Sequence, residues 1–257
     1  MNAQKEFNQL VDIMKRLRKE CPWDRTQTPH SLCQYILEEA YETVEAIENG
    51  DWHELQKELG DLMLQIVFQA EIAEENKLFT LYDVIKTINE KLVRRHPHVF
   101  GEVKVKNVDE VKENWELIKV HEENRKSLLE GVPKNLSGLL RAQSLQDKAA
   151  KVGFDWDDIK GIIRKICEEI SELETAIKQK KIEEIENEIG DLLFSIVNLA
   201  RFQNINAENA LRKTINKFIS RFQYIEKKLA ERNRSLYQSS LEEMDQLWEE
   251  SKDMLDM

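Results

Sequence analysis

An internal repeat constrains the fold of this 257-residue chain most strongly, because a segment that occurs twice is expected to fold twice in the same way. The stretch ILEEAYETVEAI (36–47) matches ICEEISELETAI (166–177), and QKELGDLMLQIVFQA (56–70) matches ENEIGDLLFSIVNLA (186–200). Both matches share one offset of 130 residues, with no insertion between them. The repeat predicts two copies of one module, the first over residues 1–130 and the second over residues 131–257.

The composition of both copies favours helix. Only eight Gly and four Pro interrupt a chain rich in Glu, Lys, Leu, Gln and Ile, all of which are compatible with helix. The one strand-like stretch, GEVKVKNV (101–108), is expected to be a loop. Turn-forming residues predict breaks at 21–31, 48–52, 94–101, 130–138 and 151–158. We therefore predict an all-α fold, made of two tandem copies of a helical-bundle module.

Charge and hydropathy exclude several classes of protein. A net charge of −11 argues against nucleic acid polymers as partners, since proteins that bind them present basic patches. The sequence contains no apolar N-terminal segment and no apolar run of the roughly 18 residues that a membrane helix needs, so no membrane association is expected. Cys21, Cys33 and Cys167 have unrelated spacings, which fits a reducing cytoplasm better than a disulfide framework.

Carboxylates concentrate on the predicted hairpin of the second copy. Glu169 and Glu172 are three residues apart and share one helix face, as do Glu188 and Asp191 on the next helix. Antiparallel packing of these helices would bring the four side chains across one groove, where like charges repel and partial burial costs several kcal/mol. A hard divalent cation relieves both costs, and oxygen ligands suit Mg²⁺ or Mn²⁺.

These carboxylates allow three other interpretations. A chain with 49 acidic residues forms many such pairs on solvated helix faces, so a solvated surface is the first alternative. A ferritin-like di-iron site would require Glu-x-x-His, and all five histidines lie in the first copy. A helical regulatory or scaffold protein, whose acidic grooves bind partners without turnover, is the third.

The ordered motifs resemble a known family. EExxE followed after a hairpin by ExxD, together with RLRKECPWDRTQT, RRHPHVFG and VGFDW, is similar to the all-α nucleoside triphosphate pyrophosphohydrolases of the tandem-domain type. The resemblance covers essentially the whole chain. It implies a Mg²⁺-dependent enzyme, with Mn²⁺ as a substitute, that hydrolyses NTPs and dNTPs between the α- and β-phosphates to the monophosphate and pyrophosphate. It also implies a homodimer whose subunits complete each helical bundle.

The resemblance also implies roles for residues of the second copy. The metal ligands would be Glu169, Glu172, Glu188 and Asp191. Glu168 and Glu172 would be the catalytic residues that orient or deprotonate water. The substrate would be bound by Lys217, Arg221, Asn198, Trp248 and Lys252. The sequence departs from close relatives at Asn187, where they would carry another Glu, and this change leaves the four ligands intact.

Phosphate binding needs cations here, because the chain contains no GxxxxGK loop to cradle phosphates. Lys217 and Arg221, four residues apart, would present two cations on one helix face, although a solvated face is equally consistent with their spacing. Trp248 is by pattern alone more typical of a core residue than of a base platform. His96 and His98 match no standard metal motif and are interpreted as structural.

The two copies differ along one helix face. In the second copy this face carries Glu188, Asp191, Ser195 and Asn198. In the first copy the corresponding residues are Glu58, Asp61, Gln65 and Phe68. A phenylalanine therefore closes the polar face in the first copy only. We predict, as the resemblance also implies, that the second copy is catalytic. A possible second metal site in the first copy would consist of Glu39, Glu42, Glu58 and Asp61.

Overall fold

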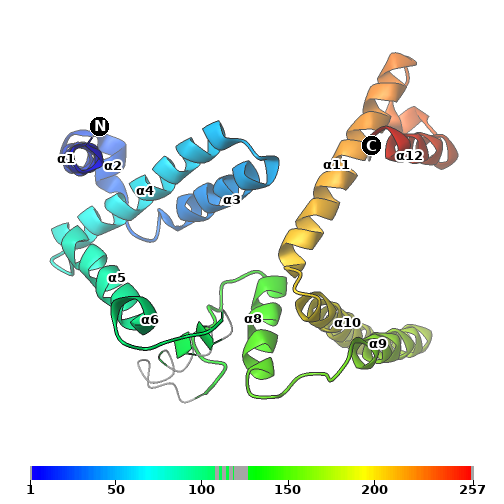
Figure 1. The fold of residues 1–257 in the computed structure, drawn as a ribbon. Coiled ribbons are helices and arrows are strands. Elements are labelled where there is room, and N and C mark those ends of the chain that lie inside the picture. Colours follow the sequence, from blue (N-terminus) through cyan, green and yellow to red (C-terminus); the bar gives the residue numbers. More distant parts are fainter. Residues whose placement is uncertain (1, 108–109, 112–113, 116–117, 119–126, 256–257) are drawn as a thin grey trace. The chain divides into compact units, whose positions relative to one another are not determined.

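The computed structural model describes residues 2–107, 110–111, 114–115, 118 and 127–255, which are mostly helical (Figure 1). These residues include no strand, which confirms the predicted all-α fold. Residues 101–107 form an irregular segment, as expected, and residue 108 of that stretch lies outside the described residues. None of the described helices is both long and apolar enough to cross a membrane.

The chain divides into two compact units, Met1–Glu122 and Glu123–Met257. The sequence predicts the junction slightly later, at 130/131. Residues just before that point are tied to the second unit, because Lys148 Nζ donates hydrogen bonds to the carbonyl oxygens of Leu128 (3.1 Å) and Glu130 (2.7 Å). Lys148 belongs to a helix of the second unit, so these bonds draw the connecting segment onto it.

Six helices of the first unit are described. They are α1 (Ala3–Glu20), α2 (Pro22–Thr26), α3 (Cys33–Asn49), α4 (Trp52–Glu75), α5 (Leu81–Arg95) and α6 (Pro97–Phe100). The α3 helix packs along α4, and α1 packs against α4. The core of this unit gathers Met14, Leu32, Val67, Phe68 and Ile72. Phe68 is only 3% exposed, so its ring belongs to the core.

The second unit repeats the hairpin. Its helices are α8 (Gly138–Ala150), α9 (Ile159–Gln179), α10 (Ile182–Phe202), α11 (Ala207–Glu231), the short 3₁₀ helix η1 (Leu236–Gln238) and α12 (Leu241–Leu255). The α9 helix packs along α10, α8 packs against α10, and α11 packs against α12. The α4 and α10 helices begin at Trp52 and Ile182, which are 130 residues apart, as the repeat predicts.

The two hairpins turn at equivalent residues with different chemistry. Gly50 ends α3 with φ of +66°, and Lys180 ends α9 with φ of +57°. Both are in the left-handed region, which glycine adopts readily and which a residue with a Cβ adopts at a cost. The tight turn makes the two helices of each hairpin antiparallel, and this arrangement brings the acidic motifs of α9 and α10 face to face.

Candidate active site

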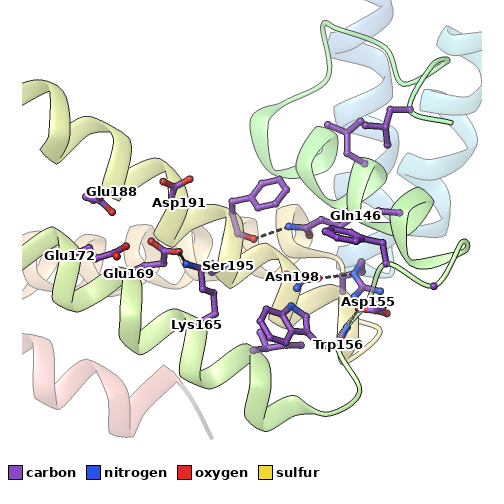
Figure 2. Close-up of a pocket in the computed structure, with 18 residues that line it drawn as sticks. Gln146, Asp155, Trp156, Lys165, Glu169, Glu172, Glu188, Asp191, Ser195 and Asn198 are labelled. Carbon is purple, nitrogen blue, oxygen red and sulfur yellow. Dashed lines mark hydrogen bonds and ion pairs between the residues drawn. The ribbon is translucent and has the colours of Figure 1, made fainter. Parts of the chain in front are cut away.

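The acidic motifs of the second repeat converge across the α9–α10 hairpin. Glu169 and Glu172 of α9 and Glu188 of α10 each offer a carboxylate oxygen, and these oxygens all lie within 4.8 Å of one another. Figure 2 shows the three side chains together with Asp191. Glu169 is buried, with 3% of its surface exposed. The cluster therefore concentrates negative charge around one buried carboxylate, which water solvates poorly.

The electrostatics of the cluster favour a cation. Burial raises the pKa of Glu188, and the negative charges of Glu172, Glu169 and Asp191 raise it further. Each of these effects disfavours an additional ionised carboxylate, whereas the positive charge of a bound cation would favour the ionised form. All the donors are carboxylate oxygens, the type of ligand that a hard divalent cation prefers. The residues present thus fit a divalent metal.

Lys165, one turn before the EExxE motif, is part of the site and is missed by the sequence analysis. Its Nζ lies 2.7 Å from Glu168 Oε1 and 2.7 Å from Glu169 Oε1. These hydrogen bonds raise the pKa of Lys165, so the ammonium stays charged. The repeat gives no signal for it, because Tyr35 occupies the equivalent position in the first copy, but its spacing three and four residues before Glu168 and Glu169 places it on the same helix face.

Glu168 lies apart from the pocket. Its side chain is 56% exposed and contacts Lys165, whereas Glu172 lines the pocket itself. The two glutamates expected to act on water therefore occupy different environments. Glu172 has direct access to a molecule bound in the pocket, and Glu168 can act there only through Lys165 or after a change of side-chain conformation.

A pocket of about 850 Å³ contains the carboxylates and extends along α10 toward α8 (Figure 2). Ser195 and Asn198 line it further along the same face of α10. Asn198 Oδ1 accepts a hydrogen bond from Arg201 Nε at 3.0 Å, and the Arg201 guanidinium pairs with Asp155. This network joins α10 to the loop that precedes α9, so that loop forms a wall of the pocket.

The remaining expected substrate residues lie in the α11–α12 hairpin. The Arg221 guanidinium carbon is 5.5 Å from the centroid of the Trp248 ring, and that ring packs on Phe218 at 5.4 Å. Lys252 Nζ pairs with Glu249, and Lys217 is exposed. Among the described residues around the pocket, none of these four predicted substrate residues contributes to its lining. The structure thus groups Arg221 with Trp248 but does not bring them to the carboxylates.

The first copy contains an acidic cluster of the same size. Glu39, Glu58 and Asp61 offer oxygens within 4.8 Å of one another, and Glu42 is not a member of this group. Burial raises the pKa of Glu39 and of Glu58, and neighbouring carboxylates add to both shifts. Three of the four residues expected at a second metal site are therefore close together.

Phe68 occupies the position that corresponds to Asn198. Its ring packs in the core with Met14 and Leu32, and the Arg18 guanidinium carbon lies 5.7 Å from the ring centroid. In the first unit the Phe68 ring is thus packed against α1, whereas Asn198 lines the pocket in the second unit. The polar face of α4 ends at Gln65, which is itself buried.

Comparisons with known proteins agree with this architecture. The family model described as the MazG nucleotide pyrophosphohydrolase domain matches residues 27–100 and 158–225, so each match includes one carboxylate-bearing hairpin. The nucleoside triphosphate pyrophosphohydrolase/pyrophosphatase MazG of Thermotoga maritima is 44% identical over 250 residues, which cover 96% of this chain and 95% of the relative. The nucleoside triphosphate pyrophosphohydrolase of Escherichia coli is 41% identical over 255 residues, which cover 96% of this chain and 97% of the relative.

A solved crystal structure of a mazG-related protein from Thermotoga maritima is also similar. It is 28% identical, with a TM-score of 0.40, and the match covers 44% of this chain and 97% of that chain. The identity shared with the two full-length relatives extends over nearly the whole chain, and both repeats match the family model. The chain therefore belongs to the MazG nucleotide pyrophosphohydrolase family.

Proposed function

We propose that this protein is a nucleoside triphosphate pyrophosphohydrolase whose second copy carries the active site. It hydrolyses NTPs and dNTPs between the α- and β-phosphates, yielding a nucleoside monophosphate and pyrophosphate, and it requires Mg²⁺, for which Mn²⁺ substitutes. The observation that carries the proposal is the convergence of Glu169, Glu172 and Glu188 in a pocket large enough for a nucleotide. A cytoplasmic location accords with three free cysteines.

The carboxylates provide the metal-binding part of the site. Glu169, Glu172, Glu188 and Asp191 would hold the cation, which when bound neutralises charge on the phosphates and on the leaving pyrophosphate. Lys165 orients the buried Glu169 carboxylate through its 2.7 Å contact. Its raised pKa would keep a positive charge beside the bound triphosphate at neutral pH.

Hydrolysis requires a water molecule that a carboxylate can orient. The water oxygen forms a new bond to one of the two phosphorus atoms that share the α–β bridging oxygen, and the bond from that phosphorus to the bridging oxygen breaks. The monophosphate and pyrophosphate then separate, and the proton from the water passes to a nearby base. Glu172 is the better candidate for this base because it lines the pocket. Glu168 lies beside Lys165 and would act by orienting that ammonium or a second water. Lys217 and Arg221 would bind the triphosphate, and Trp248 and Lys252 would contact the nucleotide.

Product analysis tests the proposal directly. Full-length protein is incubated with ATP and Mg²⁺, and the products are separated by ion-exchange chromatography. AMP and pyrophosphate in equal amounts, absent when EDTA is added, are the expected result. ADP and inorganic phosphate would contradict the proposed bond, and the absence of turnover with every NTP would favour the helical scaffold interpretation.

We further propose that the protein is a homodimer. Ile189, Leu193 and Ile196 form an apolar stripe on α10 and are each 45–50% exposed. The first copy repeats this stripe at Leu59, Met63 and Ile66, which are 44–55% exposed. Such apolar faces are stabilised when they are covered by another helix pair, and the equivalent face of a second subunit is complementary to them.

Light scattering coupled to size-exclusion chromatography tests the dimer. We expect a mass near twice the 30.3 kDa of one chain. Leu193→Glu would introduce a charge into the covered stripe and should shift the protein toward the monomer. Glu174→Gln, at an exposed site on α9, is the control and should leave the mass unchanged. A monomeric mass for the wild-type protein at micromolar concentration would contradict the proposal.

A further inference from the structure

The pocket has two chemically different ends. Glu172 and Glu188 lie at one end, and Trp156 and Gln146 lie at the other (Figure 2). The second end is mainly apolar and includes three aromatic side chains that remain accessible. Trp156 is 42% exposed, Phe194 is 47% exposed and Phe154 is 82% exposed. Exposed aromatic rings that line a cavity, beside a polar end, are typical of a binding site for a flat apolar group.

Trp156 is held in place by its surroundings. Its ring lies so close to Gly161 that a Cβ there would be only 2.6 Å from Trp156 Cε3. Asp158 caps the first turn of α9 by accepting a hydrogen bond from Gly161 N at 2.9 Å. Asp155 accepts a bond from Trp156 N at 2.8 Å and pairs with Arg201 of α10. The ring is therefore oriented before any ligand binds, which lowers the entropy cost of stacking on it.

Gln146 adds a polar group at the same end. Its side chain extends from α8, is 8% exposed, and donates a hydrogen bond from Nε2 to the carbonyl oxygen of Phe194 at 2.9 Å. This bond fixes the amide, and Oε1 has no hydrogen-bond partner among the described residues. A buried acceptor without a donor is unfavourable, so a ligand N–H that reaches it would gain a hydrogen bond and remove that penalty.

We propose that this end of the pocket is the nucleobase subsite, in which the base stacks on Trp156 and an exocyclic amino group donates a hydrogen bond to Gln146 Oε1. The inference rests on the proposed function, because the carboxylate end would then hold the triphosphate of the same molecule. Phe154 and Phe194 form the flanks of the subsite. Stacking accepts any base, whereas an unpaired acceptor selects bases that carry an amino group.

Steady-state kinetics of the full-length protein test the stacking. Trp156→Leu should raise the KM for ATP about tenfold, since stacking on an aromatic ring contributes strongly to base binding. The inhibition constant of inorganic tripolyphosphate, which has no base, should stay within about twofold of the wild-type value. Trp156→Phe retains a ring and should show a smaller effect, and Trp52→Leu, which removes a 79% exposed tryptophan of the first unit, should show none.

Phe154→Ala provides a second variant that keeps the test decisive if Trp156→Leu fails to fold. Phe154 is 82% exposed, so its removal leaves the core intact. The KM for ATP should rise about threefold, again with no change for tripolyphosphate. An unchanged KM in these variants, or an equal weakening of ATP and tripolyphosphate, would overturn the assignment of the subsite.

Matched nucleotide pairs test Gln146. ATP and inosine triphosphate differ at the exocyclic group, an amino group against a carbonyl, and at the adjacent ring nitrogen, which carries hydrogen only in inosine triphosphate. CTP and UTP differ in the same way. The wild-type protein should prefer the amino-bearing member of each pair about threefold to tenfold in kcat/KM. Gln146→Leu should reduce this preference to within about twofold. No preference in the wild-type protein would overturn the proposed role of Gln146.

The two proposals fail in different ways. If the wild-type protein hydrolyses no NTP, the proposed function fails, and calorimetric binding of ATP and of tripolyphosphate still tests the subsite. A higher affinity for ATP than for tripolyphosphate that Trp156→Leu abolishes would support the subsite without turnover. If the protein hydrolyses NTPs but substitutions of Trp156, Phe154 and Gln146 do not change the kinetics, the proposed function stands and the proposed subsite is wrong.

Discussion

Glu172 and Asp191 lie beside Glu188, and their negative charges add to the burial that raises the pKa of that carboxyl. Replacing either with its amide should abolish Mg²⁺-dependent pyrophosphate release, because a metal ligand is lost. The fold should survive, since the amide also removes some repulsion. Pyrophosphate release and the circular dichroism melting temperature measure the two effects. Glu174→Gln, at an exposed position of α9, is the control. Full activity in Glu172→Gln or Asp191→Asn would contradict the proposed metal site.

Lys217 and Arg221 are expected to bind the triphosphate, although the described pocket lies elsewhere in the second unit. Neutralising either residue should raise the KM for ATP or lower kcat by about tenfold, with much less effect on AMP binding. Lys227→Ala, on the exposed surface of the same helix, is the matched control. Unchanged kinetics in Lys217→Ala and Arg221→Ala would indicate that neither residue contacts the triphosphate.

Arg18 shows how a buried charge is satisfied in the first unit. It is 8% exposed, and Arg18 Nε donates to Glu75 Oε1 at 2.9 Å. The hydrogen bond from Arg18 lowers the pKa of Glu75, so the pair stabilises the fold above the ordinary pKa of a glutamate and loses this contribution as pH falls. Glu75→Gln should destabilise the unit by about 1–2 kcal/mol at pH 7.

Urea denaturation at pH 7 and near pH 3.5 measures this effect. The difference between wild type and Glu75→Gln should shrink at the lower pH, because the unfolded chain then gains a proton at Glu75 that the ion-paired carboxylate resists in the folded state. Glu20→Gln breaks a pair with Arg16 in which both side chains are mostly exposed, so it should have little effect at either pH. A difference that is independent of pH would argue against the ion pair as its cause.

At the level of the helical elements, the two hairpin turns make a matched comparison. Lys180 adopts a left-handed conformation with φ of +57°, where Gly50 stands in the other copy. Lys180→Gly should therefore raise the stability of the second unit by about 1 kcal/mol, because the steric cost of Cβ is removed. Gly50→Ala should have the opposite effect in the first unit. Thermal melting measures both, and a lower melting temperature for Lys180→Gly would contradict the argument.

At the level of the whole molecule, the copies share an acidic hairpin but differ in what covers it. Phe68 is packed in the core of the first unit, whereas Asn198 lines an accessible pocket in the second. We expect a fragment of residues 123–257 to hydrolyse NTPs with Mg²⁺ and residues 1–122 to do so poorly or not at all. In the full-length protein, Glu42→Gln should retain most turnover, and Glu172→Gln should abolish it. Equal losses from the two variants would mean that both copies contribute.

Much of this organisation follows from the sequence, because it depends on local spacing. Residues three or four apart share a helix face, so EExxE and ExxD predicted the grouping of Glu169, Glu172 and Glu188 once the turn at Lys180 made α9 and α10 antiparallel. The offset of 130 residues likewise predicted the second hairpin. Substrate roles for Lys217 and Arg221 came from the resemblance and remain predictions.

The wall of the pocket depends on tertiary structure. Gln146 meets the Phe194 carbonyl across 48 residues of sequence, and Arg201 meets Asp155 across 46. No periodicity encodes such contacts, because they depend on how α8 and the loop before α9 pack onto the hairpin. The close approach of Trp156 to Gly161 is of the same kind. Sequence by itself therefore determined the helices, their repeat and the acidic cluster, whereas packing between distant segments decided the shape and the aromatic end of the pocket.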